Sequence, residues 1–486
     1  MIPLSLADIA AVVDGQQSDI PDPDARVTGP VVIDSRKVAE GSLFAAFAGE
    51  RADGHDFARS AVGDGAVAVL ATRPVGVPAI VVDDVTRALG ALARHAVERL
   101  GTQVVALTGS AGKTSTKDLI AQLLEHLGPT VWTPGSLNNE IGLPLTALRA
   151  EAGTRHLVLE MGARGVGHIR YLTELTPPRI GVVLNVGTAH IGEFGGREQI
   201  ALAKGELVEA LPPAAPDGEG GGPDGGGRGG VAVLNADDPL VRAMSERTSA
   251  RVLLFGEAED AHVRAENVRL TDQGRPTFTL RTPTGCGDVT MRLYGEHHVS
   301  NALAAAAVAH ELGMPAGDIA TALSAASTLS RWRMEVTERA DGVTVVNDAY
   351  NANPESTRAA LRALAAMGRG RRTWAVLGEM AELGDESLAE HDAVGRLAVR
   401  LNVSKLVAVG GQEAVWLDMG AKNEGSWGEE SVHVSDAEAA VELLRSELRP
   451  GDVVLVKASR SVGLERVADA LVEPGTDEGE VAARWV

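Results

Sequence analysis

The chain has one cysteine and few aromatic residues. Cys286 is the single cysteine, so no intrachain disulfide can form, which suits a reducing compartment. A catalytic thiol at Cys286 is disfavoured, because no His/Asn signature surrounds it. Aromatic residues make up 3% of the 486 residues, so the cores must be built mainly from Val, Leu, Ala and Ile.

Basic residues are outnumbered by acidic ones. The chain has 45 Lys and Arg against 66 Asp and Glu, a formal net charge of -21. Nucleic-acid affinity comes largely from Lys and Arg on phosphates, so no nucleic-acid partner is expected. If the substrates are anionic, a few local cations and metal ions must outweigh the overall negative field.

Targeting and membrane signals are also missing. No Lys or Arg precedes Arg26, so a secretory signal peptide is not expected. No apolar run approaches the length that a membrane-spanning helix needs. We therefore expect a cytoplasmic protein that does not insert into a membrane.

The length predicts two to four domains, and the pattern favours three, all of the α/β class. Residues 1–101 are expected to form a small α/β domain. Its strands are expected in short apolar runs between residues 31 and 85, among them VVIDSR from residue 31. A helix at 86–101 has apolar residues at helical spacing and ends at Gly101.

A second domain is expected over residues 102–331. Strands at 104–107, 156–160, 180–186 and 231–237 alternate with helices, including one from Thr114 to Gly128, and this alternation predicts a mostly parallel sheet. Residues 212–230 consist largely of Gly, Pro and acidic residues, which cannot bury apolar area. We predict that this insert is disordered.

A third domain is expected over residues 332–486, where the alternation resumes and predicts a Rossmann-like, doubly wound sheet. The expected strands and helices are listed here: strands at 343–350, 373–380, 406–411 and 452–459; helices at 357–368 and 437–448.

A phosphate-binding loop is predicted where the strand at 104–107 ends. The usual pattern has a glycine where Leu107 stands, yet Gly109 and Gly112 allow the backbone to curl around an anion at a helix N-terminus. Lys113 would neutralise the outer phosphates, and Thr114 would offer its hydroxyl to Mg²⁺. The alternative is a glycine-rich turn with a solvated lysine.

Three further residues are candidates near such a loop. Glu160 ends a predicted strand, where an acidic metal ligand of a nucleotide site would stand, although a capping or salt-bridged glutamate is equally compatible. His190 follows another strand and is either a buried structural histidine or a metal ligand. Lys204 would by default be a solvated helix residue. These features alone do not separate a switch, a motor and a synthetase.

The loop TGSAGKT at 108–114 resembles that of the Mur ligases, which build the peptidoglycan precursor. The resemblance covers nearly the whole chain apart from the glycine-rich insert. It rests further on residues 34–57, which resemble the UDP-binding N-terminal domain, and on residues 136–148, which resemble the stretch that handles the UDP-sugar-peptide. Residues 347–356 and 377–384 most resemble the members that add D-alanyl-D-alanine. It implies an ATP-dependent peptide-bond-forming ligase with UDP-N-acetylmuramoyl-tripeptide and D-alanyl-D-alanine as substrates. Apart from the resemblance, we expect a monomer.

The resemblance also implies roles for individual residues. It implies two Mg²⁺ ions, with Thr114 and Glu160 on one and His190 on the other. It also implies carbamylation of Lys204, which would then coordinate or orient a metal. Catalytic roles fall on Lys113, Lys204, His190 and Arg333. The ATP site would comprise Thr108, Gly109, Ser110, Ala111, Gly112, Lys113, Thr114, Ser115, His297, Asn301, Arg333, Asp348, Tyr350 and Asn351. The other substrates would contact Ser35, Arg36, Asn138, Asn139, Lys457 and Arg460.

Two alternatives remain. One is another ligase of the superfamily, which adds diaminopimelate or lysine, or extends folate with glutamate. The D-N-P-[RK] motif of the first kind is missing, and the N-terminal stretch from Asp34 to Phe57 disfavours the last. The other alternative is a nucleotide-dependent binding or regulatory module, which would bind ATP without a UDP-sugar.

Overall fold

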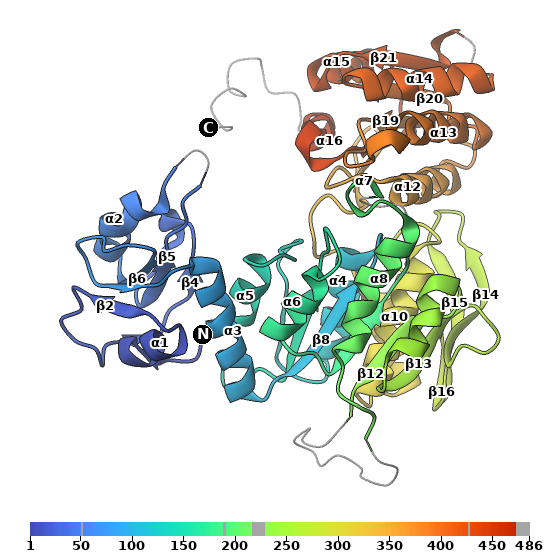
Figure 1. Ribbon diagram of the computed structural model, residues 1–486. Coiled ribbons are helices and arrows are strands. Elements are labelled where there is room, and N and C mark those ends of the chain that lie inside the picture. Colours follow the sequence, from blue (N-terminus) through green and yellow to red (C-terminus); the bar gives the residue numbers. More distant parts are fainter. Residues whose placement is uncertain (50–51, 188–190, 216–228, 426–427, 473–486) are drawn as a thin grey trace.

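The computed structural model describes residues 1–49, 52–187, 191–215, 229–425 and 428–472. It arranges them in three α/β bodies that follow one another along the chain (Figure 1). The predicted α/β class and the predicted succession of sheets are therefore confirmed. Most of the glycine-rich insert lies outside the described residues, as does His190.

The first body is built on a five-stranded sheet. Only β2 runs antiparallel to its neighbour. The strand order is β2 (Gln16–Ser18), β7 (Ala79–Val81), β6 (Ala66–Ala71), β5 (Ser42–Ala45) and β4 (Val31–Val32). The remaining elements are the paired strands β1 (Leu4–Ser5) and β3 (Arg26–Val27) and the helices α1 (Leu6–Val12) and α2 (Ala58–Gly63).

Helix α3 (Val85–Leu100) joins the first body to the second. The carboxylate of Asp84 begins the helix by accepting a hydrogen bond from the backbone N–H of Thr86 at 2.7 Å. Gly101, in the left-handed region at φ 61°, ends it. A Cβ on Gly90 would lie 2.7 Å from a methyl carbon of Leu175 in α6 (His168–Leu175), so a larger residue here would require the Leu175 side chain to move.

The central sheet has nine strands. Its order is β16 (Gly285–Thr290), β15 (Pro276–Thr282), β14 (Val263–Leu270), β13 (Arg251–Gly256), β12 (Val231–Asn235), β11 (Ile180–Val183), β8 (Gln103–Thr108), β10 (His156–Glu160) and β9 (Thr130–Trp132). From β9 to β14 in this spatial order, with β8 included, all neighbouring strands are parallel, and a mostly parallel sheet was predicted. The antiparallel strands β15 and β16 extend the sheet, and the sequence analysis did not foresee them.

Helices cover both faces of this sheet. Along β8, Val104 and Ala106 belong to one core, and Val105 and Leu107 to the other, as strand alternation requires. On the Leu107 side lie α4 (Lys113–Glu125), α10 (His298–Glu311) and α11 (Ala316–Ala325). On the Ala106 side lie α5 (Gly142–Ala147), α6 and α8 (Arg197–Glu209), with the short helices α7 (Ile191–Phe194) and α9 (Pro239–Arg242) nearby.

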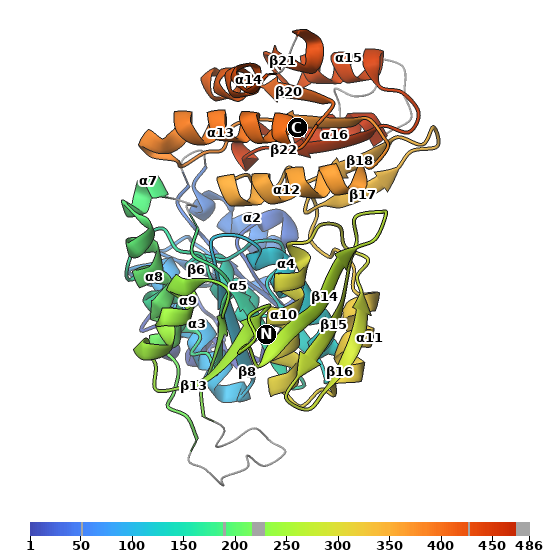
Figure 2. The same cartoon turned by 90° about the vertical axis from the view of Figure 1, so that its right-hand side faces the viewer.

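The third body is doubly wound, as predicted. Its sheet order is β17 (Glu335–Glu338), β18 (Thr344–Asn347), β22 (Val453–Lys457), β19 (Thr373–Leu377), β20 (Lys405–Val409) and β21 (Ser431–Val434), and only β17 is antiparallel. One face carries α12 (Pro354–Met367), α13 (Ser387–Arg400) and α14 (Gln412–Glu424); the other carries α15 (Ala437–Glu447) and α16 (Glu465–Val472). Figure 2 shows α12 on the side that faces the central body.

Some element bounds differ from the prediction. The stretch from Val31 is a strand for only two residues, because the Asp34 side chain accepts a hydrogen bond from Arg36 N–H and starts a 3-10 turn at Ser35–Lys37. Helix α12 begins earlier than expected, since Asn353 caps it ahead of Pro354. Within the described residues, no helix is both long and apolar enough to cross a membrane.

Candidate active site

A cavity of about 500 Å³ lies where the central body meets the third body. This size suits a nucleotide or a similar small molecule. Its walls come from the carboxyl ends of β8, β10 and β18 and from the first turns of α4, α10 and α12. Ligands of open α/β sheets bind at such strand ends.

Most of the predicted site residues line this one cavity. They are Ser110, Ala111, Gly112, Lys113, Thr114, Ser115, Asn138, Asn139, Glu160, Lys204, His297, Asn301, Arg333, Asp348, Tyr350, Asn351 and Lys457. The segments that carry them are up to several hundred residues apart in the sequence, so the fold brings them together.

The loop between β8 and α4 is held by the side chain of Asn185. Its side-chain oxygen accepts hydrogen bonds from the backbone N–H groups of Ser110 and Ala111, both at 2.9 Å, and its amide nitrogen donates to the Ala111 carbonyl at 3.1 Å. Two N–H groups of the loop are therefore bonded to Asn185, which also lines the cavity. Donors for an anion remain at the first turn of α4, where helix geometry leaves the N–H groups of Lys113 to Ser115 without a helical partner.

Gly112 has the backbone conformation that the loop requires. Its φ is +80°, in the left-handed region. A Cβ at this position would also lie 2.6 Å from the side-chain oxygen of Asn301 on α10. Both constraints favour glycine at this position.

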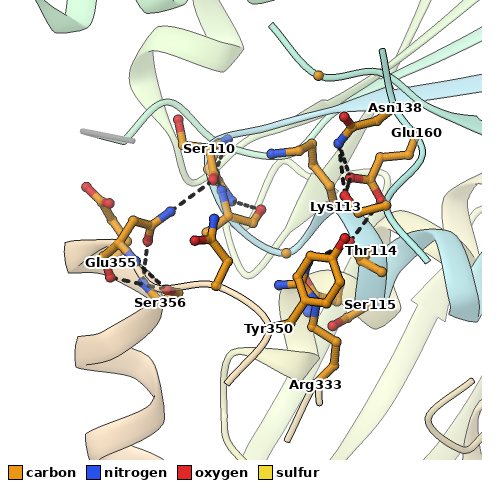
Figure 3. A pocket seen from close by; sticks show the side chains of 18 of the residues that line it. Ser110, Lys113, Thr114, Ser115, Asn138, Glu160, Arg333, Tyr350, Glu355 and Ser356 are labelled. Atoms are coloured by element: carbon orange, nitrogen blue, oxygen red, sulfur yellow. Dashed lines mark hydrogen bonds between the residues drawn. The ribbon is translucent and has the colours of Figure 1, made fainter. Parts of the chain in front are cut away.

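Thr114 and Glu160 form the centre of a polar cluster (Figure 3). The Thr114 hydroxyl donates to Glu160 Oε2 at 2.9 Å, and the other carboxylate oxygen accepts from Ser136 Oγ at 2.8 Å and Asn138 Nδ2 at 2.7 Å. Glu160 is fully buried at the end of β10. A hydroxyl and a carboxylate side by side fit the oxygen ligands that Mg²⁺ takes beside phosphates.

Two basic residues flank this cluster. Lys113 Nζ donates to the Gly109 carbonyl at 2.7 Å, and burial lowers its pKa although the Glu160 carboxylate opposes the shift. Arg333 donates to Thr114 Oγ1 at 3.1 Å, and its guanidinium carbon lies 4.1 Å from the centre of the Tyr350 ring. Arg333 belongs to the segment that connects the central body to the third body, so it bridges the two walls of the cavity.

Lys204 is buried on α8 and lines the same cavity. Burial lowers its pKa well below the ordinary value, and the neighbouring charge of Lys113 adds to this shift. Among the described residues, no side chain or carbonyl makes a hydrogen bond with its amine. The default interpretation of a solvated helix residue is therefore wrong.

Glu206 fixes the helix that carries Lys204. Its carboxylate accepts hydrogen bonds from the backbone N–H groups of Gly167 and Arg170, the second at 3.0 Å. These N–H groups begin α6, so Glu206 caps one helix from another. The position of Lys204 along the cavity wall is thereby tied to the loop after Glu160.

His297 and Asn301 reach the cavity from the start of α10. Burial lowers the pKa of His297 to about 4, so the ring is neutral at physiological pH. His298 beside it is also buried, and its Nδ1 lies 3.5 Å from Asn301 Nδ2.

Asp348 and Lys457 pair with each other. Lys457 Nζ lies 2.7 Å from Asp348 Oδ2 and also donates to the Asn351 carbonyl at 2.8 Å. The second Asp348 oxygen accepts from the Met334 N–H at 3.1 Å. The resemblance assigns Asp348 to the ATP site and Lys457 to another substrate. In the structure the two side chains pair with each other where they line the cavity, so their charges offset each other.

Several predicted residues do not line this cavity. Arg460 is paired with Glu465 and lies over the Trp332 ring. Ser35 and Arg36 lie in the first body, where Arg36 is exposed and paired with Asp34. Two further residues, Thr108 and Gly109, end β8 and lead into the loop without lining the cavity.

Family models match most of the chain. Residues 107–309 match the Mur ligase middle domain, residues 332–460 match the "Mur ligase, glutamate ligase domain", and residues 30–97 match the "Mur ligase family, catalytic domain". The chain belongs to the Mur ligase family. The phosphate loop, Glu160 and Lys204 all fall within the matched middle domain.

Individual members of the family are similar over their whole length. The UDP-N-acetylmuramoyl-tripeptide–D-alanyl-D-alanine ligase of Mycobacterium bovis is 50% identical, over 98% of this chain and 99% of that protein. The crystal structure of MurF from Acinetobacter baumannii is 31% identical with a TM-score of 0.84, covering 97% and 99% of the two chains. The MurF ligase of Thermotoga maritima in complex with ADP is also 31% identical with a TM-score of 0.76, covering 91% and 97%.

Sequence reasoning missed the residues that support the loop. Asn185 follows β11 at the same sheet edge as the loop, and Asn353, which caps α12, donates to the Ser110 carbonyl at 3.3 Å. A polar residue directly after a buried parallel strand was the available signal for Asn185. Asn353 carried only a helix-start signal, because its contact with the loop spans 243 positions in the sequence.

Proposed function

We propose that the chain is an ATP-dependent ligase that joins D-alanyl-D-alanine to UDP-N-acetylmuramoyl-tripeptide, giving UDP-N-acetylmuramoyl-pentapeptide, ADP and phosphate. The observation that carries the proposal is the cavity in which a phosphate loop, the Thr114–Glu160 pair and Arg333 meet between two bodies. The family and the names of the similar proteins support the substrates.

The chemistry explains why ATP is needed. A carboxylate does not react with an amine directly, because the leaving group would be oxide or hydroxide. Transfer of the γ-phosphoryl group to the tripeptide carboxylate releases ADP and gives an acyl phosphate with a good leaving group. The dipeptide amine then attacks the carbonyl carbon, and the tetrahedral intermediate expels phosphate as the C–N bond is completed and the amine loses its proton.

The residues would then divide the work of charge neutralisation and orientation. The first turn of α4 and Lys113 would hold the β- and γ-phosphates. Arg333, stacked on Tyr350, would meet the same phosphates from the third body. Asn301 and His297 would lie near the adenine, and Asp348 and Asn351 near the ribose. Asn138 and Asn139 would contact the UDP-linked substrate.

Mg²⁺ fits the Thr114 hydroxyl and the Glu160 carboxylate, and it would neutralise the transferring phosphoryl group. Among the described residues, no three His, Cys, Asp or Glu side chains are grouped to hold a metal ion by themselves. A second ion at His190 remains part of the proposal, with phosphate oxygens as further ligands.

Carbamylation would give Lys204 a function that its environment suits. The neutral amine attacks CO₂ and loses a proton, so an N–C bond forms and a neutral amine becomes an anion. The lowered pKa favours the neutral amine, which is the form that reacts with CO₂. The carbamate would orient a cation beside Lys113 and Thr114.

The remaining parts of the proposal concern organisation. We assign residues 1–101 to a UDP-substrate domain with Ser35 and Arg36, 102–331 to the ATP domain, and 332–486 to the domain that receives the dipeptide with Lys457 and Arg460. We propose that the protein acts as a monomer in the cytoplasm, which agrees with the single cysteine.

The deciding experiment measures phosphate release from Mg-ATP and UDP-N-acetylmuramoyl-tripeptide, with and without D-alanyl-D-alanine. We expect release that depends on the dipeptide and a product with the mass of the UDP-pentapeptide. The Lys113→Met variant should lose the activity, whereas Lys405→Met, which alters a lysine on β20, should keep it. Release that single amino acids support better than the dipeptide would indicate another ligase of the family.

A further inference from the structure

A second lysine of helix α4 is buried more completely than Lys113. Lys117 is 0% exposed and lies one turn further along the helix. Its ammonium donates to the Thr133 carbonyl at 2.8 Å and to the Gly135 carbonyl at 2.9 Å, and it pairs with Asp118 Oδ1 at 2.8 Å. A buried charge is retained only where its partners offset the loss of water, so this set of contacts is specific.

The same pair holds the segment that connects the central body to the third body. Asp118 accepts hydrogen bonds from the backbone N–H of Ser330 at 3.0 Å and from its hydroxyl at 3.1 Å, and Lys117 Nζ lies 3.3 Å from that hydroxyl. One turn later, Gln122 exchanges two hydrogen bonds with the backbone of Ser327, both at 3.0 Å. The start of the connecting segment is therefore fixed to the phosphate-loop helix.

The connecting segment is fixed again only a few residues later. The Met334 N–H donates to Asp348 Oδ1 on the third body. Between the two fixed points, Trp332 and Met334 have φ of +59° and +51°, a region that side-chain-bearing residues rarely adopt. The Trp332 carbonyl also accepts a hydrogen bond from the Tyr350 N–H at 3.3 Å, so the contacts of the segment change from the central body to the third body within residues 331–334, which include Arg333.

Lys117 is also connected to the strand that carries Glu160. The residue whose carbonyl it binds, Thr133, accepts a hydrogen bond from the Glu160 N–H through its hydroxyl at 3.1 Å. The strand that ends at Glu160 and the segment that leads to Ser136 and Asn138 are thus both attached to this ammonium. The Lys117 ammonium therefore joins the phosphate-loop helix, the strand that carries Glu160 and the connecting segment.

We propose that Lys117 and Asp118 are positioning residues that fix the pivot of the third body against the phosphate-loop helix, so that Arg333 meets Thr114. They touch no reacting atom. They set where the third body can rotate and keep Arg333 within reach of the phosphates. The geometric part of this proposal does not depend on the reaction, and only the kinetic part rests on the proposed function.

Spin labels can measure the position of the third body directly in the full chain. Cys286 is exposed on β16 and is the only native cysteine, and Met419→Cys adds a second site on α14, where Met419 is 50% exposed. The distance distribution between the two labels then reports the orientation of the third body. We expect it to broaden in Ser330→Ala and Asp118→Asn relative to the parent.

Lys405→Met is the matched control. Lys405 is also buried and paired, with Glu447 at 2.6 Å, but it lies on β20 within the third body. The Lys405→Met substitution should leave the distances between the two spin labels unchanged. Ser330→Ala removes one hydroxyl only, so it decides the question even if Lys117→Met or Asp118→Asn does not fold. Unchanged distances in Ser330→Ala, or equal broadening in Lys405→Met, would overturn the proposal.

Kinetics test the link to Arg333. Ser330→Ala should lower kcat about fivefold to tenfold, the size of one hydrogen bond lost from a buried network, while KM for Mg-ATP stays within about twofold. A raised KM with unchanged kcat would contradict the positioning role. If the parent protein shows no turnover, the proposed function fails, and the label distances still decide the role of Lys117 and Asp118.

Discussion

The loop wall of the cavity, formed by residues 110–114 and Glu160, differs from Lys204 on α8 and His297 at the start of α10 in how its polar groups are satisfied. On the loop wall, Asn185, Glu160 and Asn353 supply partners for the backbone and hydroxyl groups of residues 110–114. Lys204 and His297, by contrast, reach the cavity from helices on opposite faces of the sheet and are titratable groups whose pKa values are lowered, chiefly by burial.

This difference separates two functions of one site. The loop wall is preorganised, so a phosphate can bind without first rearranging its support. The lowered pKa values of Lys204 and His297 favour their neutral forms, so anionic charge beside them has to come from a ligand or from a modification of Lys204. The four predictions below test this division.

The largest effect is expected for Lys204→Ala. Removing the amine removes the group that would become an anion, and we expect turnover to fall about 10²- to 10³-fold, as for other lost electrostatic groups in active sites. Steady-state phosphate release measures this effect. Lys405→Ala controls for the loss of a buried lysine elsewhere.

Short carboxylates such as acetate or propionate should restore part of the Lys204→Ala activity, because they can place an anion in the vacated space. Restoration that requires the carboxylate supports the carbamate. Near-normal turnover of Lys204→Ala without any added carboxylate would refute both the carbamylation of Lys204 and its contrast with the loop wall.

Gly112→Ala should weaken nucleotide binding about tenfold to thirtyfold. The left-handed backbone strains any other residue, and the new methyl group would meet the Asn301 oxygen. The dissociation constant for ADP, measured by calorimetry, reports the change. Gly101→Ala is the matched control, because Gly101 also has positive φ but has no atom near its Cβ position. Equal nucleotide affinities in the two variants would contradict this reasoning.

Asn185→Ala should raise KM for ATP about tenfold. The variant loses three hydrogen bonds to Ser110 and Ala111, so the loop has to order itself upon binding. Asn235→Ala removes a buried asparagine of the neighbouring strand β12, which bonds to the Leu184 carbonyl instead of the loop. We expect that control to lower stability and leave KM unchanged; a parallel rise in both variants would show a general loss of order.

Local patterns predicted the fold and the loop wall well. A buried strand, a glycine loop and a helix are read from neighbouring residues, so Gly112, Lys113 and Thr114 could be found from the sequence. The carboxylate of Glu160 was found because it ends an apolar strand. The resemblance to Mur ligases added Lys204, whose burial no local pattern indicated.

Contacts between distant segments could not be predicted. Asp118 and Ser330 are 212 positions apart, and Lys457 and Asp348 are 109 apart, so their pairing depends on how the bodies pack. The antiparallel strands β15 and β16 were missed for another reason. Many side chains of these two strands are partly or fully exposed, so few apolar residues mark them in the sequence.

The smallest effect at neutral pH is expected for His297, and it concerns stability. Its pKa of about 4 is lowered first by burial and further by Lys457, while Asp348 acts in the opposite direction. An unfolded histidine has a pKa of about 6.5, so the unfolded chain takes up a proton between pH 6.5 and 4 that the folded chain does not. The stability is full above pH 6.5 and falls as the pH drops toward 4.

His297→Gln should therefore remove about 2 kcal/mol of this acid dependence, after allowance for the partial exposure of the ring. Urea unfolding of the parent and the variant at pH 7.5, 6, 5 and 4.5 measures the difference, with the exposed His433→Gln as control. If the two stability curves stay parallel down to pH 4.5, His297 is not held neutral by its surroundings. Lys204 would then be the single titratable residue that differs from the loop wall in this way.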